Sequence, residues 1–157
     1  NLDLRRRIAE ALKEQLKNVG IELELRTYEW GTFFSDIKKG NFHLYSLAWV
    51  GIQDPDIYYQ IFHSSSVPPN GDNRGYYSSP RVDRLLEKGR TATGITERTL
   101  IYAEVQRILA EDLPYIPLWW WKNVIVKTPS IQGFVPYADG DFISLKKVSF
   151  RSPTPVQ

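Results

Sequence analysis

Apolar residues recur at helical spacing in the first part of the chain. The apolar stripe of residues 4–19 consists of Leu4, Ile8, Leu12, Leu16 and Val19. This is the 3.6-residue period of an amphipathic helix, with Asp3 as the expected N-cap and Gly20 as the residue that stops it. Residues 21–25 then alternate apolar and acidic side chains with period two, which predicts a half-buried strand. A helix followed by a strand indicates the α/β fold class.

The same two periods continue along the chain. Further strands are expected over residues 42–50, 115–126 and 142–150. Further helices are expected over residues 32–39 (ended by Gly40), over residues 57–62, from Ser79-Pro80 onward, and over residues 96–112. Residues 64–75 are rich in Ser, Pro, Asn and Gly, which predicts a surface loop between these elements.

Composition narrows the function classes. A chain of 157 residues suggests one domain, and 21 aromatic residues (5 Trp, 9 Tyr and 7 Phe) indicate either an aromatic core or an aromatic ligand site. The net charge is only +2, too balanced for a general nucleic-acid binder. Zero Cys excludes disulfides, zinc–thiolate sites and cysteine nucleophiles. Because the chain opens on Asn1 and contains no Met, we expect it to be a piece of something longer.

The sequence lacks the motifs of catalysis and of metal binding. His43 and His63 are the only histidines, and neither has a partner at zinc-ligand spacing. A Gly-x-Ser-x-Gly elbow and a phosphate-binding Walker loop are both missing. We therefore expect no enzyme, no metal and no cofactor, and the residues on their own indicate only a soluble α/β domain with an aromatic cleft.

Three consecutive tryptophans, residues 119–121, are the most conspicuous local feature. In a strand, one face would carry Ile116, Leu118, Trp120, Val124 and Val126. That face is expected to be core, so Trp119 and Trp121 would point the other way. They either stack on a ligand or cover the second face of a buried sheet.

The segment from Trp49 to Asp56 is the other candidate site. A large aromatic residue ends an expected strand, and a glycine-containing loop with Asp54 and Asp56 follows. Ligands of open α/β sheets collect beyond the carboxyl ends of the strands. Alternatively, the two carboxylates only cap the helix at residues 57–62.

Several stretches carry a family resemblance through their order and spacing. They are residues 7–10 through 20–25, residues 42–50 ending in Trp49, Asp54-Pro55-Asp56, residues 77–86, residues 98–118 and Gln132-Gly133-Phe134. Together they resemble the bacterial extracellular solute-binding proteins of family 5, which serve peptide, oligopeptide and nickel uptake by ABC transporters. The resemblance covers nearly the whole chain.

The resemblance implies a mixed β-sheet flanked by helices, one lobe of a type II periplasmic-binding-protein fold. Residues 1–150 would be most of the distal, C-terminal lobe and residues 151–157 a tail, with the N-terminal lobe missing. Family members enclose a small solute, possibly a peptide, between two lobes by hinge closure. They then deliver it to a membrane permease, so the implied location is periplasmic or extracellular.

The resemblance also suggests cleft residues. In peptide-binding members an aspartate three residues after the strand-ending Trp typically neutralises the peptide α-amino group, but here that position is Ile52. Asp54 is the candidate replacement. The remaining expected ligand-binding residues are Trp49, Trp119, Trp121 and Trp30. Two other functions stay open: a secreted carbohydrate-binding or carbohydrate-active domain that uses the same aromatics, and an interaction domain whose aromatics are all core.

Overall fold

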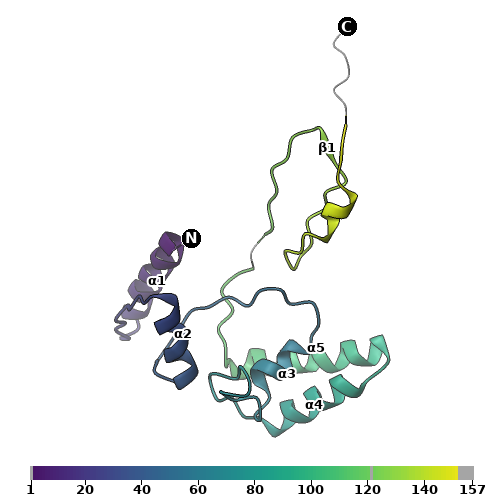
Figure 1. Ribbon diagram of the computed structural model, residues 1–157. Coiled ribbons are helices and arrows are strands. Elements are labelled where there is room, and N and C mark those ends of the chain that lie inside the picture. Colours follow the sequence, from purple (N-terminus) through teal and green to yellow (C-terminus); the bar gives the residue numbers. More distant parts are fainter. Residues whose placement is uncertain (1, 121, 152–157) are drawn as a thin grey trace. The chain divides into compact units, whose positions relative to one another are not determined.

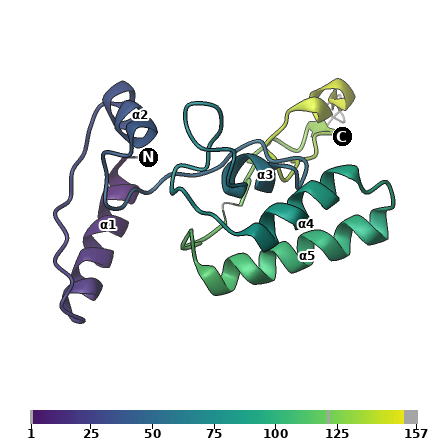
Figure 2. The ribbon, with the colours of Figure 1, turned by 90° about the horizontal axis from the view of Figure 1, so that it is seen from below.

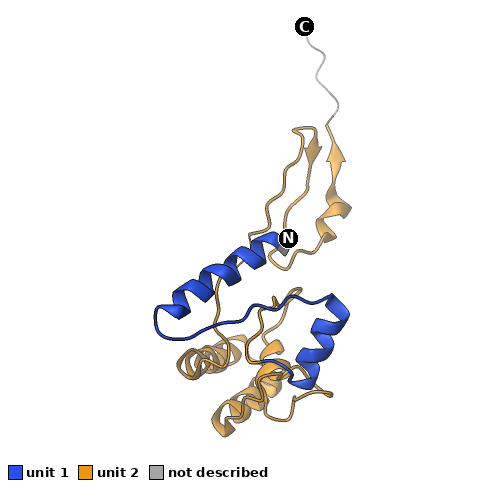
Figure 3. Ribbon diagram, turned by 90° about the vertical axis from the view of Figure 1, so that its left-hand side faces the viewer, with its two compact units in different colours: residues 1–42 blue, residues 43–157 orange. Residues whose placement is uncertain are grey.

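The computed structural model describes residues 2–120 and 122–151 (Figure 1). Its helices are α1 (Leu2–Lys17), α2 (Trp30–Lys39), α3 (Ile57–Phe62), α4 (Pro80–Thr91), α5 (Ile95–Asp112) and a 3₁₀ helix, η1 (Ile143–Lys147). Its strands are β1 (Ile131–Gln132) and β2 (Ser149–Phe150). The chain divides into two compact units, residues 1–42 and 43–157 (Figure 3).

The first unit contains the two predicted helices near the start of the chain. Helix α1 begins at Leu2, so Asp3 lies in its first turn and is not the N-cap that we expected. A carboxylate in the first turn still interacts favourably with the helix dipole. Glu29 caps α2 by accepting a hydrogen bond from the Gly31 amide, and Gly40 ends α2 in the left-handed conformation at φ 75°.

The core of the second unit lies between α3, α4 and α5. Helices α4 and α5 form a hairpin and lie side by side in both views (Figures 1 and 2), and α3 packs against α4. The buried cluster consists of Ile61, Phe62, Val82, Leu86, Tyr102, Val105, Ile108 and Leu109. As predicted, Ser79 caps α4 by accepting from the Val82 amide, and Pro80 is the first residue of the helix.

The α4–α5 hairpin is close-packed at Gly89. A Cβ atom at this position would lie 2.9 Å from the Tyr102 ring, which is too close for an undisturbed contact. Gly89 therefore lets the aromatic ring of α5 lie directly against the backbone of α4. None of the helices in the described part of the chain is long and apolar enough to cross a membrane.

Most of the predicted strands are not paired. Within residues 2–120 and 122–151, the only ladder is antiparallel and joins Ile131 to Phe150 and Gln132 to Ser149. The expected strands at residues 21–25, 42–50 and 115–126 have no strand partner there. An alternating pattern favours an extended backbone, but a strand also needs a neighbour to accept its hydrogen bonds.

The expected strand at residues 142–150 is correct only at its end. Residues 143–147 form η1, which Asp141 helps to begin by accepting from the Ile143 amide at 3.0 Å. Ser144 is buried, and its hydroxyl donates to the Val135 carbonyl at 2.6 Å. This local bonding outweighs the apolar alternation. The expected tail at residues 151–157 falls, beyond residue 151, outside the described residues.

Candidate functional site

Trp49 is half-buried and packs against the core cluster of α3, α4 and α5. The guanidinium carbon of Arg74 lies 4.9 Å from the centre of its ring. Arg74 is only 5% exposed and forms an ion pair with Asp72 at 2.5 Å. A desolvated cation over a tryptophan face is a favourable contact, so Trp49 is anchored to the second unit and is not a free surface ring.

Asp54 forms a two-pronged ion pair with Arg98 of α5. Its Oδ1 accepts from Arg98 Nη2 at 2.6 Å, and its Oδ2 accepts from Nη1 at 2.9 Å. Its Oδ1 also accepts from the Asp56 backbone amide at 2.8 Å. Asp54 thus stabilises the turn that leads into α3, whereas Asp56, the residue at the N-cap position, makes no capping hydrogen bond with its side chain.

The contacts of Asp54 stabilise its charged form. Hydrogen bonds from Arg98, and then from the Asp56 amide, lower the Asp54 pKa from 3.8 to about 2. Burial opposes this shift only weakly, because the carboxylate remains about half exposed. Asp54 is therefore ionised in the folded protein at any pH near neutrality.

This pKa difference predicts a pH-dependent effect of Asp54→Asn. A carboxyl whose pKa falls on folding stabilises the protein above its unfolded pKa, and that stability disappears as pH falls through the folded value. The wild type should be more stable than Asp54→Asn at pH 6, and the difference should shrink between pH 4 and pH 2. Urea unfolding at several pH values measures it; a difference that is constant with pH contradicts the ion pair.

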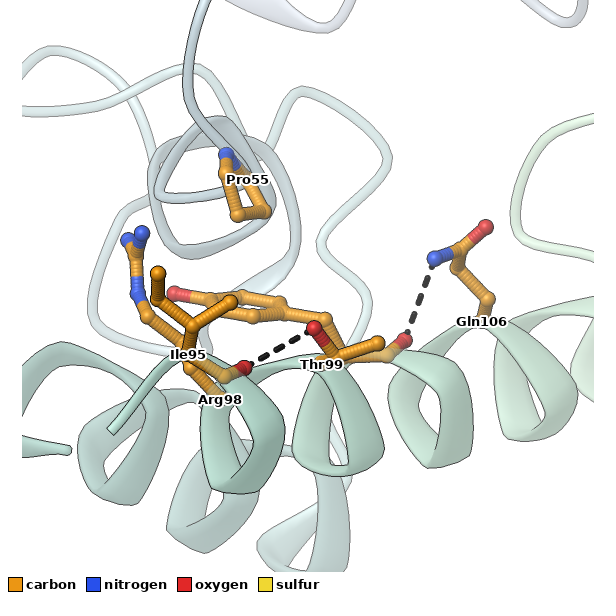
Figure 4. Close-up of a pocket in the computed structure, with 6 residues that line it drawn as sticks. Pro55, Ile95, Arg98, Thr99 and Gln106 are labelled. Carbon is orange, nitrogen blue, oxygen red and sulfur yellow. Dashed lines mark hydrogen bonds between the residues drawn. The ribbon is translucent and has the colours of Figure 1, made fainter. Parts of the chain in front are cut away.

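A shallow hollow of about 290 Å³ lies beside this ion pair. It is lined by Pro55, Ile95, Arg98, Thr99, Tyr102 and Gln106. Figure 4 shows Ile95, Arg98 and Thr99 along α5, with Pro55 across from them. The Thr99 hydroxyl donates to the Ile95 carbonyl and the Gln106 amide to the Tyr102 carbonyl, so both side chains are held to their own helix.

The expected core face of residues 116–126 is exposed where the structure describes it. Trp120 is 88% exposed, although its face was expected to be core, and Trp119 is the more covered of the two at 42%. The other side chains of the expected core face, Ile116, Leu118, Val124 and Val126, are exposed as well. The prediction is wrong for the described residues because this segment pairs with no strand there. Trp121 lies outside the described residues.

Trp30 belongs to the first unit. It is the first residue of α2, and its ring stacks on Phe34 with centroids 5.4 Å apart and planes inclined by 14°. Trp49 and Asp54 both lie in the second unit and each pairs with an arginine, Arg74 and Arg98 respectively. Trp30 therefore lies in one unit, and Trp49 and Asp54 lie in the other.

Sequence reasoning missed the two arginines. Arg98 had one detectable signal: it precedes Tyr102 by four residues, so both side chains lie on one face of a helix. The Arg98 guanidinium indeed lies 5.3 Å from the Tyr102 ring centre. Arg74 had no signal, because it lies in a loop rich in turn-forming residues. The described residues contain no group of three or more His, Cys, Asp or Glu side chains that could hold a metal ion.

The chain is similar to proteins of known family. Residues 1–70 match the family described as bacterial extracellular solute-binding proteins, family 5 middle. The chain is 30% identical over 137 residues to di/tripeptide-binding protein 4 of Pseudomonas aeruginosa. That alignment covers 85% of this chain and 26% of the relative.

Two solved structures are similar along nearly all of the chain. One is HbpA2 from Haemophilus parasuis, with a TM-score of 0.77 and 23% identity over 94% of this chain and 29% of that one. The other is the ABC transporter-associated periplasmic binding protein DppA from Helicobacter pylori in complex with the peptide STSA. Its TM-score is 0.74 and its identity 25%, over 93% of this chain and 29% of that one.

These likenesses confirm the expected fold class, a lobe of the type II periplasmic-binding-protein fold. The chain spans between a quarter and a third of the length of the relatives that it matches. The family match over residues 1–70, taken with the peptide-binding relative and with the structural likeness, agrees with the resemblance seen in the sequence. The chain is similar to the bacterial extracellular solute-binding proteins of family 5, whose family model matches residues 1–70, and to a peptide-binding relative along most of its length.

Proposed function

We propose that this chain is the distal, ligand-closing lobe of an ABC importer's substrate-binding protein. The observation that carries the proposal is the likeness, over 93% of this chain, to a periplasmic binding protein in complex with a peptide. Because the chain spans only 29% of that protein, the remainder would supply the other lobe. The solute, a peptide or another small molecule, would be enclosed by hinge closure in the periplasm or outside the cell and passed to the permease.

The placement of the aromatic residues supports this proposal. Trp49 is fixed by Arg74 and the core, so it can form a rigid wall for a solute. Trp119 and Trp121 stay predictions from the sequence. Trp30, in the first unit, stays a prediction from the sequence. Residues 44–53 carry no regular secondary structure, and their backbone can pair with an extended peptide as an added strand does. Asp54 lies at the end of this segment, where its carboxylate is paired with Arg98.

The proposal is tested on the complete protein that contains this sequence. Titration calorimetry with Ala-Ala, tri-alanine and Ser-Thr-Ser-Ala should show saturable binding of at least one peptide, with a Kd of about 1 μM. Maltotriose is the matched probe for the carbohydrate alternative and should not bind. Binding of maltotriose with no response to any peptide would contradict the proposal and favour a carbohydrate-binding domain.

A further inference from the structure

Both carboxylates of Asp54-Pro55-Asp56 are held by arginines of the α4–α5 hairpin. Asp54 pairs with Arg98 of α5, as described above, and Asp56 Oδ1 lies 3.0 Å from Arg90 Nε of α4. The Arg90 guanidinium carbon also lies 4.1 Å from the centre of the Tyr59 ring. The residues before α3 are therefore linked to both helices of the hairpin, by one ion pair to α4 and one to α5.

Arg98 is itself fixed in place by the hairpin. Its Nε donates to the Gly89 carbonyl of α4 at 3.2 Å, and its guanidinium lies against the ring of Tyr102. Tyr102 is only 3% exposed, and Gly89 leaves room for its ring. One planar side chain thus joins α4, α5 and the residue Asp54. A lysine could reproduce the charge but not the fork of donors that satisfies both oxygens and the carbonyl.

The segment between Trp49 and Asp54 needs such an anchor. Gly51 has φ 68°, a left-handed bend, and residues 50–54 are exposed. Gln53 adds one further contact by donating to Asp139 Oδ2 at 2.9 Å. The loop is therefore held at its far end, by Asp54 and Gln53, while Trp49 holds its near end.

We propose that Arg98 is a positioning residue that holds the 50–56 loop, and so one edge of the solute wall, against the α4–α5 hairpin. This inference rests on the proposed function for its relevance to solute binding. The negative charge of Asp54 is then neutralised within the protein by Arg98, because both carboxylate oxygens accept hydrogen bonds from that guanidinium. A cationic group of a solute would have to compete with it.

Hydrogen–deuterium exchange of the complete protein tests this role. In Arg98→Gln, the amides of Asp56 and Ile57, which donate to Asp54, should exchange about fivefold faster than in the wild type, as expected for the loss of a half-exposed ion pair. Exchange of the α5 amides should stay unchanged. Arg107→Gln is the matched control, because Arg107 lies on the same helix and pairs with Glu104 and Glu111 of that helix. It should leave the loop unaffected.

Coupling between the two partners is the second readout. Asp54→Asn should speed loop exchange as much as Arg98→Gln does, and the double variant should exchange no faster than either single variant. Arg98→Lys, which keeps the charge, should give an intermediate rate and provides the test if Arg98→Gln does not fold. Loop exchange equal to that of Arg107→Gln, or single effects that multiply in the double variant, would overturn the proposal.

The exchange experiment needs no solute, so the two proposals fail separately. A protein that binds maltotriose and none of the three peptides, but whose loop loosens in Arg98→Gln, contradicts the proposed function and supports the anchoring role. A protein that binds Ser-Thr-Ser-Ala with an unchanged loop in Arg98→Gln contradicts the anchoring role alone. With both proposals correct, Arg98→Gln should also weaken Ser-Thr-Ser-Ala binding about fivefold, while Arg107→Gln should not.

Discussion

Leu86→Ala is expected to lower the free energy of unfolding of this protein by about 2–5 kcal/mol. Leu86 lies on α4 and is 0% exposed, in the same buried cluster as Val105 and Tyr102 of α5. Truncation removes apolar surface from the core and leaves a cavity that the hairpin can fill only in part. Since whole domains are stable by about 5–15 kcal/mol, this loss is a large share of the total. Urea unfolding monitored by circular dichroism measures it.

Leu100→Ala is the matched control for this prediction. Leu100 lies on α5 and is 67% exposed, so the same substitution removes little buried surface. Its effect should stay within about 0.5 kcal/mol, as for most surface changes. Equal losses in the two variants would contradict the assignment of the core to the inner faces of α4 and α5.

The helices could be predicted because their signals are local. The structure confirms that α4 begins after Ser79 with Pro80 as its first residue, and that α2 ends at Gly40. A cap acts within one turn, so a few neighbouring residues are enough to recognise it. The expected cap at Asp3 is wrong because α1 begins at Leu2, earlier than its apolar stripe indicates.

The strands could be predicted only in part, because pairing is not local. Residues 116–120 have no regular secondary structure, and their apolar side chains are exposed in the described part of the chain. The alternation shows which side chains would share a face, and it does not show which segment supplies the partner strand. Residues 143–147 form the helix η1 in place of the expected strand, and the Ser144 hydroxyl in it donates to the Val135 carbonyl. An alternating pattern of apolar residues does not predict such a hydrogen bond.

In the candidate site, the residues next to an expected strand could be predicted from the sequence, whereas their distant partners could not. Trp49 and Asp54 were selected from their position after an expected strand, and both make specific contacts in the structure. Their partners, Arg74 and Arg98, lie far along the chain, where a charged residue on a helix or loop usually faces solvent. Only the folded α4–α5 hairpin brings Arg98 to Asp54.

These 157 residues alone are expected to bind Ser-Thr-Ser-Ala with a Kd no better than about 1 mM, roughly a thousandfold weaker than the complete protein. Small-molecule sites normally enclose about 70–90% of the ligand surface, and one lobe of a two-lobe cleft covers only part of it. The chain spans 29% of the peptide-bound relative, so most of the contacts that close over the solute would lie elsewhere.

Calorimetric titration of the 157-residue chain and of the complete protein, in the same buffer and with the same peptide, measures this ratio. Circular dichroism of the shorter chain is the necessary control, because an unfolded chain would bind weakly for a different reason. The helical signal expected from α1, α4 and α5 shows that the lobe is folded. Micromolar binding by the folded chain alone would mean that its own residues complete the site, and it would contradict closure between two lobes. Weak binding by a folded chain, restored in the complete protein, is the result that hinge closure requires, because the solute then gains its remaining contacts only when the second lobe closes over it.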